Sequence, residues 1–134
     1  MPKLENIEGI GQAYGAKLRK GGVGSIASLL SQGATPAGRK EIAQKTGLSP
    51  KLILTWINHA DLKRIRGVER QYSELLEAAG VDTVVELAQR RADNLLEKML
   101  DVNKKKKILR RPPTLSMVED WIKQAKKLPR AIHY

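Results

Sequence analysis

Two glycines near the N-terminus form the segment of this sequence best suited to bind a ligand. In Ile7-Glu8-Gly9-Ile10-Gly11 an apolar residue stands between two glycines, just before a helical pattern. Glycine adopts backbone conformations that other residues resist, so this spacing predicts a helix-hairpin-helix with Ile10 plugging the core. The backbone N–H groups of Gly9, Gly11 and Gln12 would face outward at the positive end of a helix, where phosphate binds. These N–H groups would contact phosphates and not bases, so the expected binding is independent of base sequence.

A second segment repeats this pattern with one substitution. Gly67-Val68 keeps the first glycine and the apolar plug, but Glu69 replaces the second glycine. A carboxylate stabilises a helix N-terminus, yet it also occupies or repels the place of a phosphate. We therefore expect the second hairpin to be structurally intact and weak in phosphate binding. Arg66 and Arg70 flank it and would compensate only in part.

Further basic residues are candidates for supporting contacts to a nucleic acid. Lys17 and Lys20 follow the first hairpin within the same helical pattern. A second group places six positive charges within eight positions, at Lys104, Lys105, Lys106, Lys107, Arg110 and Arg111. This group is either an arm that follows the phosphate backbone or a solvated helix end and loop. Four consecutive lysines spread around a helix and cannot all face one surface, so both interpretations stay open.

The net charge favours a polyanionic partner. The chain of 134 residues has 25 Lys and Arg against 14 Asp and Glu, which gives a formal charge of +11. The excess lies at the two ends, because residues 61–100 hold seven basic and eight acidic side chains. Nucleic acid is the first candidate for such a domain, and an acidic protein partner is the second. Aromatic residues are only 4% and Phe is absent, which argues against modules that stack bases on aromatic platforms.

The residue types argue against an enzyme, a cofactor or a metal site. The chain has no cysteine, and its two histidines, His59 and His133, show no metal-ligand spacing. No serine lies in a nucleophile motif, and no small-molecule substrate is evident. The first residues have no apolar run behind their charge, and no stretch approaches the length of a membrane span. We expect a cytoplasmic protein without a membrane segment.

An internal duplication organises the chain. Tyr14 and Tyr72 are 58 positions apart, as are seven other pairs that begin with the two hairpins. Trp56 and Trp121 are 65 positions apart, together with three pairs around them. The change of offset places an insertion in the second half, at about residues 103–113. Both tryptophans lie in apolar helical patterns, so equivalent core positions explain them better than base stacking.

The elements that must position these residues are short helices. Apolar residues recur at helical spacing, and Thr35-Pro36 and Ser49-Pro50 are typical of helix starts, with Thr114 in the place of Ser49. Strand patterns are poor. The expected fold is all-α, one compact domain over 1–134 built of two helix-hairpin-helix halves without a sheet. The halves are expected at 1–60 and 61–134, the latter with the basic insertion.

Several of these motifs together resemble a known family. The chain is similar to the bacterial DUF4332 family, a domain of unknown function, over nearly its whole length. The segments that carry this resemblance are Ile7–Gly11, Ala34–Lys40, Leu54–Trp56, Ala60–Leu62, Tyr72–Thr83 and Val118–Ile122. The resemblance implies a tandem helix-hairpin-helix architecture, with kinship to the hairpin modules of DNA repair and topoisomerase proteins. It implies no established activity and no catalytic residues.

Two functions remain from the sequence. The leading hypothesis is sequence-independent binding of double-stranded DNA through the first hairpin, supported by the basic residues. The alternative is a non-enzymatic protein-interaction or adaptor module that uses the same fold and meets an acidic partner or a second copy. Glu69 is the feature that separates them, since paired DNA-binding hairpins tolerate a carboxylate there less easily than an adaptor does.

Overall fold

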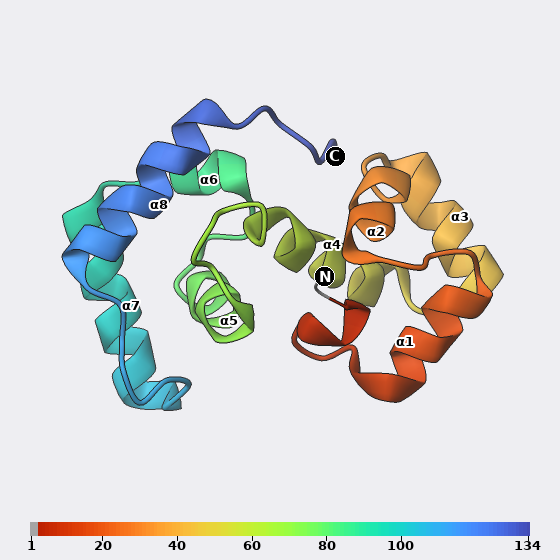
Figure 1. Ribbon diagram of the computed structural model, residues 1–134, viewed down its shortest axis with the longest axis horizontal. Helices are drawn as coiled ribbons and strands as arrows, with labels where there is room; N and C mark the ends of the chain where they lie inside the picture. The colour runs from red at the N-terminus through yellow and green to blue at the C-terminus, as the bar shows by residue number, and fades with distance from the viewer. Residues whose placement is uncertain (1–2) are drawn as a thin grey trace. The chain divides into compact units, whose positions relative to one another are not determined.

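The computed structural model describes residues 3–134, and within this range the secondary structure is helical, without a strand (Figure 1). The all-α prediction is therefore confirmed. The chain divides into two compact units. Unit 1 contains the residues up to Asp61 together with Arg130–Tyr134, and unit 2 contains Leu62–Pro129.

The helices of the two units follow the same order. Unit 1 begins with a 3-10 turn, η1 (Leu4–Asn6), and continues with α1 (Gly11–Lys20), α2 (Ile26–Gln32), α3 (Pro36–Thr46) and α4 (Pro50–Leu62), whose last residue enters unit 2. Unit 2 continues with α5 (Arg70–Ala78), α6 (Val84–Ala88), α7 (Ala92–Lys106) and α8 (Leu115–Lys127). Thus α1 to α4 correspond to α5 to α8.

Hydroxyl side chains cap several of these helices, and Ser25 and Thr83 do so at corresponding places. Ser25 caps α2 by accepting the N–H of Ser28, and Thr83, 58 positions later, caps α6 by accepting the N–H of Glu86. Thr35 caps α3 ahead of Pro36, as the sequence predicts, and Thr114 caps α8. A lost N-cap costs about 1 kcal/mol, so these residues define where each helix begins.

In each unit an exposed glycine packs against a buried tryptophan. Gly9 and Gly67 have φ of +89° and +95°, and a Cβ added to them would lie 3.6 Å from Trp56 Nε1 and 3.2 Å from Trp121 Nε1. Each tryptophan is buried and contacts a tyrosine, Tyr14 or Tyr72, with ring centroids 5.1 Å apart in both units. The predicted core positions of the two tryptophans are confirmed, and both tyrosines are partly buried against the same cores.

The two units differ most where α7 ends. Helix α7 has 15 residues and α3 has 11, so Lys104–Lys106 continue the helix instead of forming a loop. Lys107 then ends it in the left-handed conformation, with φ of +52°. The Asn103 side chain donates to the Leu109 carbonyl and accepts its N–H, at 2.9 and 2.8 Å. Ile108 and Leu109 pack against the core, so the extra segment is tied to unit 2.

The last residues of the chain belong to unit 1. Ile132 is buried in the core of this unit, and the backbone N–H of His133 donates to the Ala34 carbonyl at 2.7 Å. The buried Arg39 guanidinium donates to the carbonyls of Gly33 and His133, both at 2.8 Å. The repeat offsets do not indicate this return, because it has no counterpart in the other half.

An ion pair joins η1 to α1. The Arg19 guanidinium donates to both carboxylate oxygens of Glu5, at 2.6 and 2.7 Å. This hydrogen-bonded pair lowers the pKa of Glu5 to about 2. A Cβ at Gly15 would collide with the same carboxylate, so a small residue there leaves room for the pair.

We expect Gly9→Ala and Gly67→Ala both to lower the free energy of unfolding by about 1–3 kcal/mol, because alanine is strained at positive φ. Gly67→Ala should cost more, since its Cβ lies closer to the indole of its tryptophan. Urea unfolding monitored by circular dichroism measures this. Gly24→Ala is the matched control, because its Cβ meets nothing within 4 Å. A Gly67→Ala protein as stable as this control would contradict the role of the glycine–tryptophan contact.

The Glu5–Arg19 pair predicts a stability difference that depends on pH. At pH 7 the wild type should be more stable than Glu5→Gln, since only the carboxylate pairs with Arg19. The difference should shrink as the pH falls from about 4.5 to about 2 and protonates Glu5. Thermal melts across this range measure it, with Glu41→Gln as the control, because Glu41 pairs with Lys45 on an open helix surface. A difference in Tm that stays constant down to pH 2 would show that the pair does not stabilise the fold.

Candidate nucleic-acid interface

The first glycine turn, Gly9–Gly11, combines a buried plug with an open backbone. Ile10 is buried, whereas Gly9, Gly11 and Gln12 are exposed. Gly11 begins α1 with φ of +61°, and a Cβ placed on it would meet nothing within 4 Å. The first turn of α1 holds no acidic residue, and no side chain caps it. The first N–H groups of a helix lack intrahelical partners, so this turn offers donors to an incoming anion.

The second glycine turn, Gly67–Glu69, differs at its last residue. Val68 is buried like Ile10, and Glu69 is the N-cap of α5, with extended backbone at φ of −88°. Glu69 therefore stands at the start of α5, but its carboxylate accepts no capping hydrogen bond from the backbone of this helix. Negative charge at this point competes with a phosphate for the same positive helix end.

Lys17 and Lys20 do not reach the first glycine turn. Both are exposed and lie in the last turn of α1. At 1.5 Å per residue they are about 9 and 14 Å along the axis from Gly11. Arg19, between them, is held by Glu5. A phosphate placed at Gly11 would therefore lie beyond the reach of both lysines.

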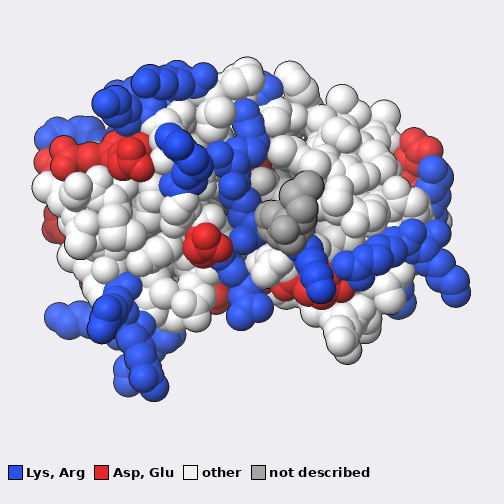
Figure 2. All heavy atoms as spheres, viewed as in Figure 1, with Lys and Arg blue, Asp and Glu red and all other residues white. Residues whose placement is uncertain are grey.

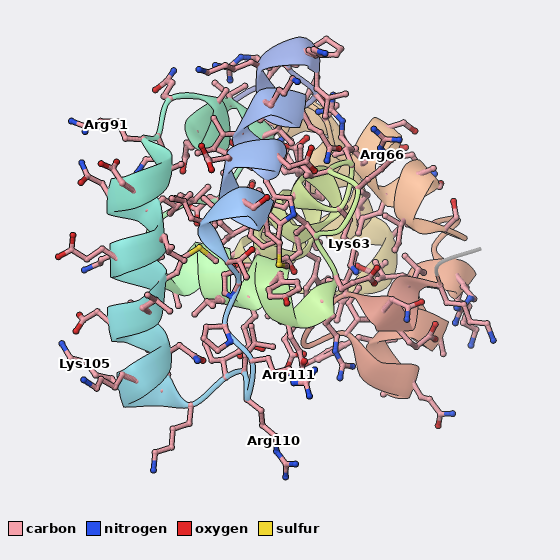
Figure 3. The ribbon with its side chains drawn as sticks, turned by 60° about the vertical axis from the view of Figure 1, so that its left-hand side comes forward. Lys63, Arg66, Arg91, Lys105, Arg110 and Arg111 are labelled. Atoms are coloured by element: carbon pink, nitrogen blue, oxygen red, sulfur yellow. The ribbon has the colours of Figure 1, made fainter. Side chains whose placement is uncertain are left out.

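The second glycine turn carries more positive charge than the first. The Gln124 side chain accepts the N–H of Arg66 at 2.8 Å and donates to its carbonyl at 3.1 Å, which fixes the backbone just before Gly67. Arg70 is the first residue of α5. Partial burial lowers the pKa of Lys63, while Glu69 opposes this shift and Arg70 adds to it. Arg66 and Lys63 are labelled in Figure 3.

The basic segment, Lys104–Lys107 with Arg110 and Arg111, lies at the end of α7 and in the following loop. All six side chains are exposed. Figure 2 shows Lys and Arg side chains gathered there, at the lower left of the view. Lys105 pairs with Asp101 at 3.4 Å, and Arg110 points away from the body of unit 2 (Figure 3). Arg66 and Arg110 lie far apart in that view, so the predicted residues of unit 2 do not form one continuous site.

Four further cations line a groove of unit 2, and none of them is among the candidate residues named from the sequence. Arg90, Arg91, Lys123 and Lys126 line a hollow of about 530 Å³ in unit 2, where α8 passes the connection between α6 and α7. The repeat could have shown this place, because none of the corresponding positions in unit 1 holds a cation: three are neutral, and the fourth, 65 positions before Lys126, is Asp61. Figure 3 shows Arg91 at the start of α7, at the opposite end from Lys105.

Over residues 3–134 no cluster of three His, Asp or Glu side chains is arranged to hold a metal ion. His59 is buried, and His133 is exposed near the end of the chain. Within the same range, no helix has the length and apolar character needed to cross a bilayer.

Comparisons with known proteins identify the family. No curated protein and no solved structure matches the chain. The model of a family described as Domain of unknown function (DUF4332) matches residues 8–128, a range that contains both glycine turns and the groove of unit 2. This match confirms the resemblance seen in the sequence. The chain belongs to the DUF4332 family.

Proposed function

We propose that this protein binds double-stranded DNA without base specificity, through a helix-hairpin-helix motif at the first glycine turn. The observation that carries the proposal is the open backbone of Gly11 at the start of α1. A phosphate placed there accepts hydrogen bonds from backbone N–H groups at the positive end of the helix. These donors recognise the DNA backbone and leave the bases unread.

The charge of the chain supports the same proposal. A formal charge of +11 attracts polyanions, and each phosphate neutralised by the protein releases counterions. Lys17 and Lys20 lie along α1, so they are placed to contact phosphates next to the one at Gly11. The proposed role is binding alone, without catalysis.

A protein-interaction role is the alternative, and Glu69 favours it. One glycine turn carries a carboxylate at the point where the other offers donors to an anion. If both turns bound DNA, the Glu69 carboxylate would weaken phosphate binding at the second turn. An adaptor tolerates the substitution, because the fold needs the buried plug Val68 and the tyrosine–tryptophan contact and not the second glycine.

Placing a carboxylate on α1 should weaken DNA binding through the loss of one phosphate contact. Gln12→Glu is the suitable change, because Gln12 is exposed and helical, whereas any side chain at Gly11 is strained by its positive φ. We expect the slope of log affinity against log salt to become shallower by about 0.9, and Glu69→Gln to make it steeper by up to about 0.9. Salt titrations of one random duplex by fluorescence anisotropy measure both slopes.

The control for these variants is Gln12→Ala, which removes the side chain but leaves the N–H groups in place and should keep the wild-type slope. Circular dichroism verifies that each variant is folded. Unchanged slopes in folded Gln12→Glu and Glu69→Gln would refute phosphate binding at the turns, and the adaptor role would then become the leading proposal.

A paired experiment distinguishes the two interpretations of the basic segment. If the end of α7 follows the DNA backbone, Lys104→Ala/Lys106→Ala should reduce the slope by about 0.9 for each lost contact. The same double substitution at Lys17 and Lys20 serves as the comparison within unit 1. A slope unchanged by the first pair would assign Lys104 and Lys106 to a solvated helix end.

A further inference from the structure

A groove of unit 1 is occupied by the chain's own C-terminal segment. Residues 131–134 form no helix, and the Ile132 side chain joins the same buried cluster as Ile57. The His133 N–H donates to the carbonyl of Ala34, in the connection between α2 and α3. The Tyr134 hydroxyl donates to Asn58 Oδ1 on α4 at 3.2 Å. This groove therefore holds a short peptide by one apolar side chain and by main-chain and side-chain hydrogen bonds.

The open groove of unit 2 lies at the corresponding place. Gly33 and Gln89 are the C-caps of α2 and α6, and Thr35 and Arg91 are the N-caps of α3 and α7. Ala34 between the first pair thus corresponds to Arg90. On the other wall, the tryptophan offset of 65 aligns Asn58 with Lys123 and Ile57 with Ile122. Arg90, Arg91, Ile122 and Lys123 all line the groove of unit 2.

The groove of unit 2 combines apolar and cationic surfaces. Leu115 and Ile122 supply apolar surface, and the Leu115 side chain is 44% exposed. Four cations, Arg90, Arg91, Lys123 and Lys126, line it with two carboxylates. One of these, Asp93, is already paired with Arg91 at 3.1 Å. The positions that correspond to Arg90, Arg91 and Lys123 in unit 1 are Ala34, Thr35 and Asn58, so the duplicated groove has gained positive charge.

We propose that the groove of unit 2 binds a short, non-helical, acidic peptide segment of a partner protein, seated as residues 132–134 are seated in unit 1. An aliphatic side chain of the partner would pack on Leu115 and Ile122, and its carboxylates would meet the four cations. The chain's own C-terminal segment is a poor occupant, because residues 127–134 contain Lys127 and Arg130 and no acidic residue. Nucleic acid is less favoured, since the corresponding groove holds a peptide.

One difference between the grooves sets how the peptide is held. In unit 1 the buried Arg39, the fourth residue of α3, donates to the His133 carbonyl. The fourth residue of α7 is Leu95, which is buried and has no donor in its side chain. The guanidinium donor of unit 1 therefore has no counterpart at this position of unit 2. Arg91, Lys123 and Lys126 line the groove with exposed side chains, so affinity in unit 2 should depend on acidic side chains of the partner and weaken with salt.

A synthetic peptide tests the proposal with the full chain. The probe is fluorescein-labelled Asp-Ala-Ile-Glu-Tyr-Asp, which keeps the order Ala-Ile-x-Tyr of residues 131–134 and adds acidic side chains. Fluorescence anisotropy measures its binding to the wild type, to Lys123→Glu/Lys126→Glu and to Leu115→Glu. The matched control is Lys104→Glu/Lys106→Glu, which makes the same change of charge at the end of α7, outside this groove. Circular dichroism verifies folding, and Leu115 and both lysine pairs have exposed side chains that tolerate substitution.

We expect both groove variants to lose at least about tenfold in affinity for the probe, and the control to lose much less. Replacing the isoleucine of the probe by serine, or its acidic residues by lysine, should also weaken binding. Absence of binding by the wild type at low salt would overturn the proposal. An equal loss of affinity in the control variant, or equal binding of the serine peptide, would also overturn it. The same holds if the groove variants lose binding of random DNA but bind the probe as the wild type does.

Discussion

The contact between a glycine and a tryptophan indole is the constraint on which each unit depends. Gly9 lies on Trp56 and Gly67 on Trp121, so each chain reversal packs against the last helix of its repeat, α4 or α8. At both glycines the positive φ would strain a residue with a side chain. Tyr14 and Tyr72 then pack on the same indoles from α1 and α5. The duplicated contact fixes the frame in both units and leaves the outer residues of each turn free to change.

Those outer residues have diverged in chemically different directions. The first turn presents Gly11 and an acid-free helix start, while the second presents Glu69 among Lys63, Arg66 and Arg70. The grooves differ as well, because one is filled by residues 132–134 and the other is open and cationic. A duplicated fold can thus keep the same core packing in both copies while the surfaces of the two copies take on different functions. We propose DNA binding for the first turn and peptide binding for the groove of unit 2.

Local and repeated features of the fold could be predicted from the sequence. Thr35-Pro36 marks the start of α3, and the equal spacing of Tyr14 and Tyr72 indicates their shared place in the core. The candidate residues at the first turn could also be named, because the geometry of Gly9–Gly11 is set by glycine itself.

Features that depend on distant contacts could not be predicted. The return of Ile132 to unit 1 rests on Arg39, 94 positions from His133, and it has no repeated counterpart to reveal it. The groove of unit 2 is open because no segment within residues 3–134 fills it, and an open groove leaves no pattern in a sequence. The residue at which α7 ends could not be fixed either. A run of lysines fits a helix as readily as a loop, and the bonds of Asn103 to Leu109 that hold the following segment are invisible to periodicity.

The most direct test of the proposed DNA contact is a titration of ¹⁵N-labelled protein with a short random DNA duplex, followed by amide chemical shifts in NMR spectra. If the first turn binds phosphate through its backbone, the amide signals of Gly11 and Gln12 shift early and saturate, while those of Gly67 and Arg70 move little. The opposite pattern, with Gly11 and Gln12 unmoved and the largest shifts at Arg90 and Lys123, would contradict DNA binding at the first glycine turn.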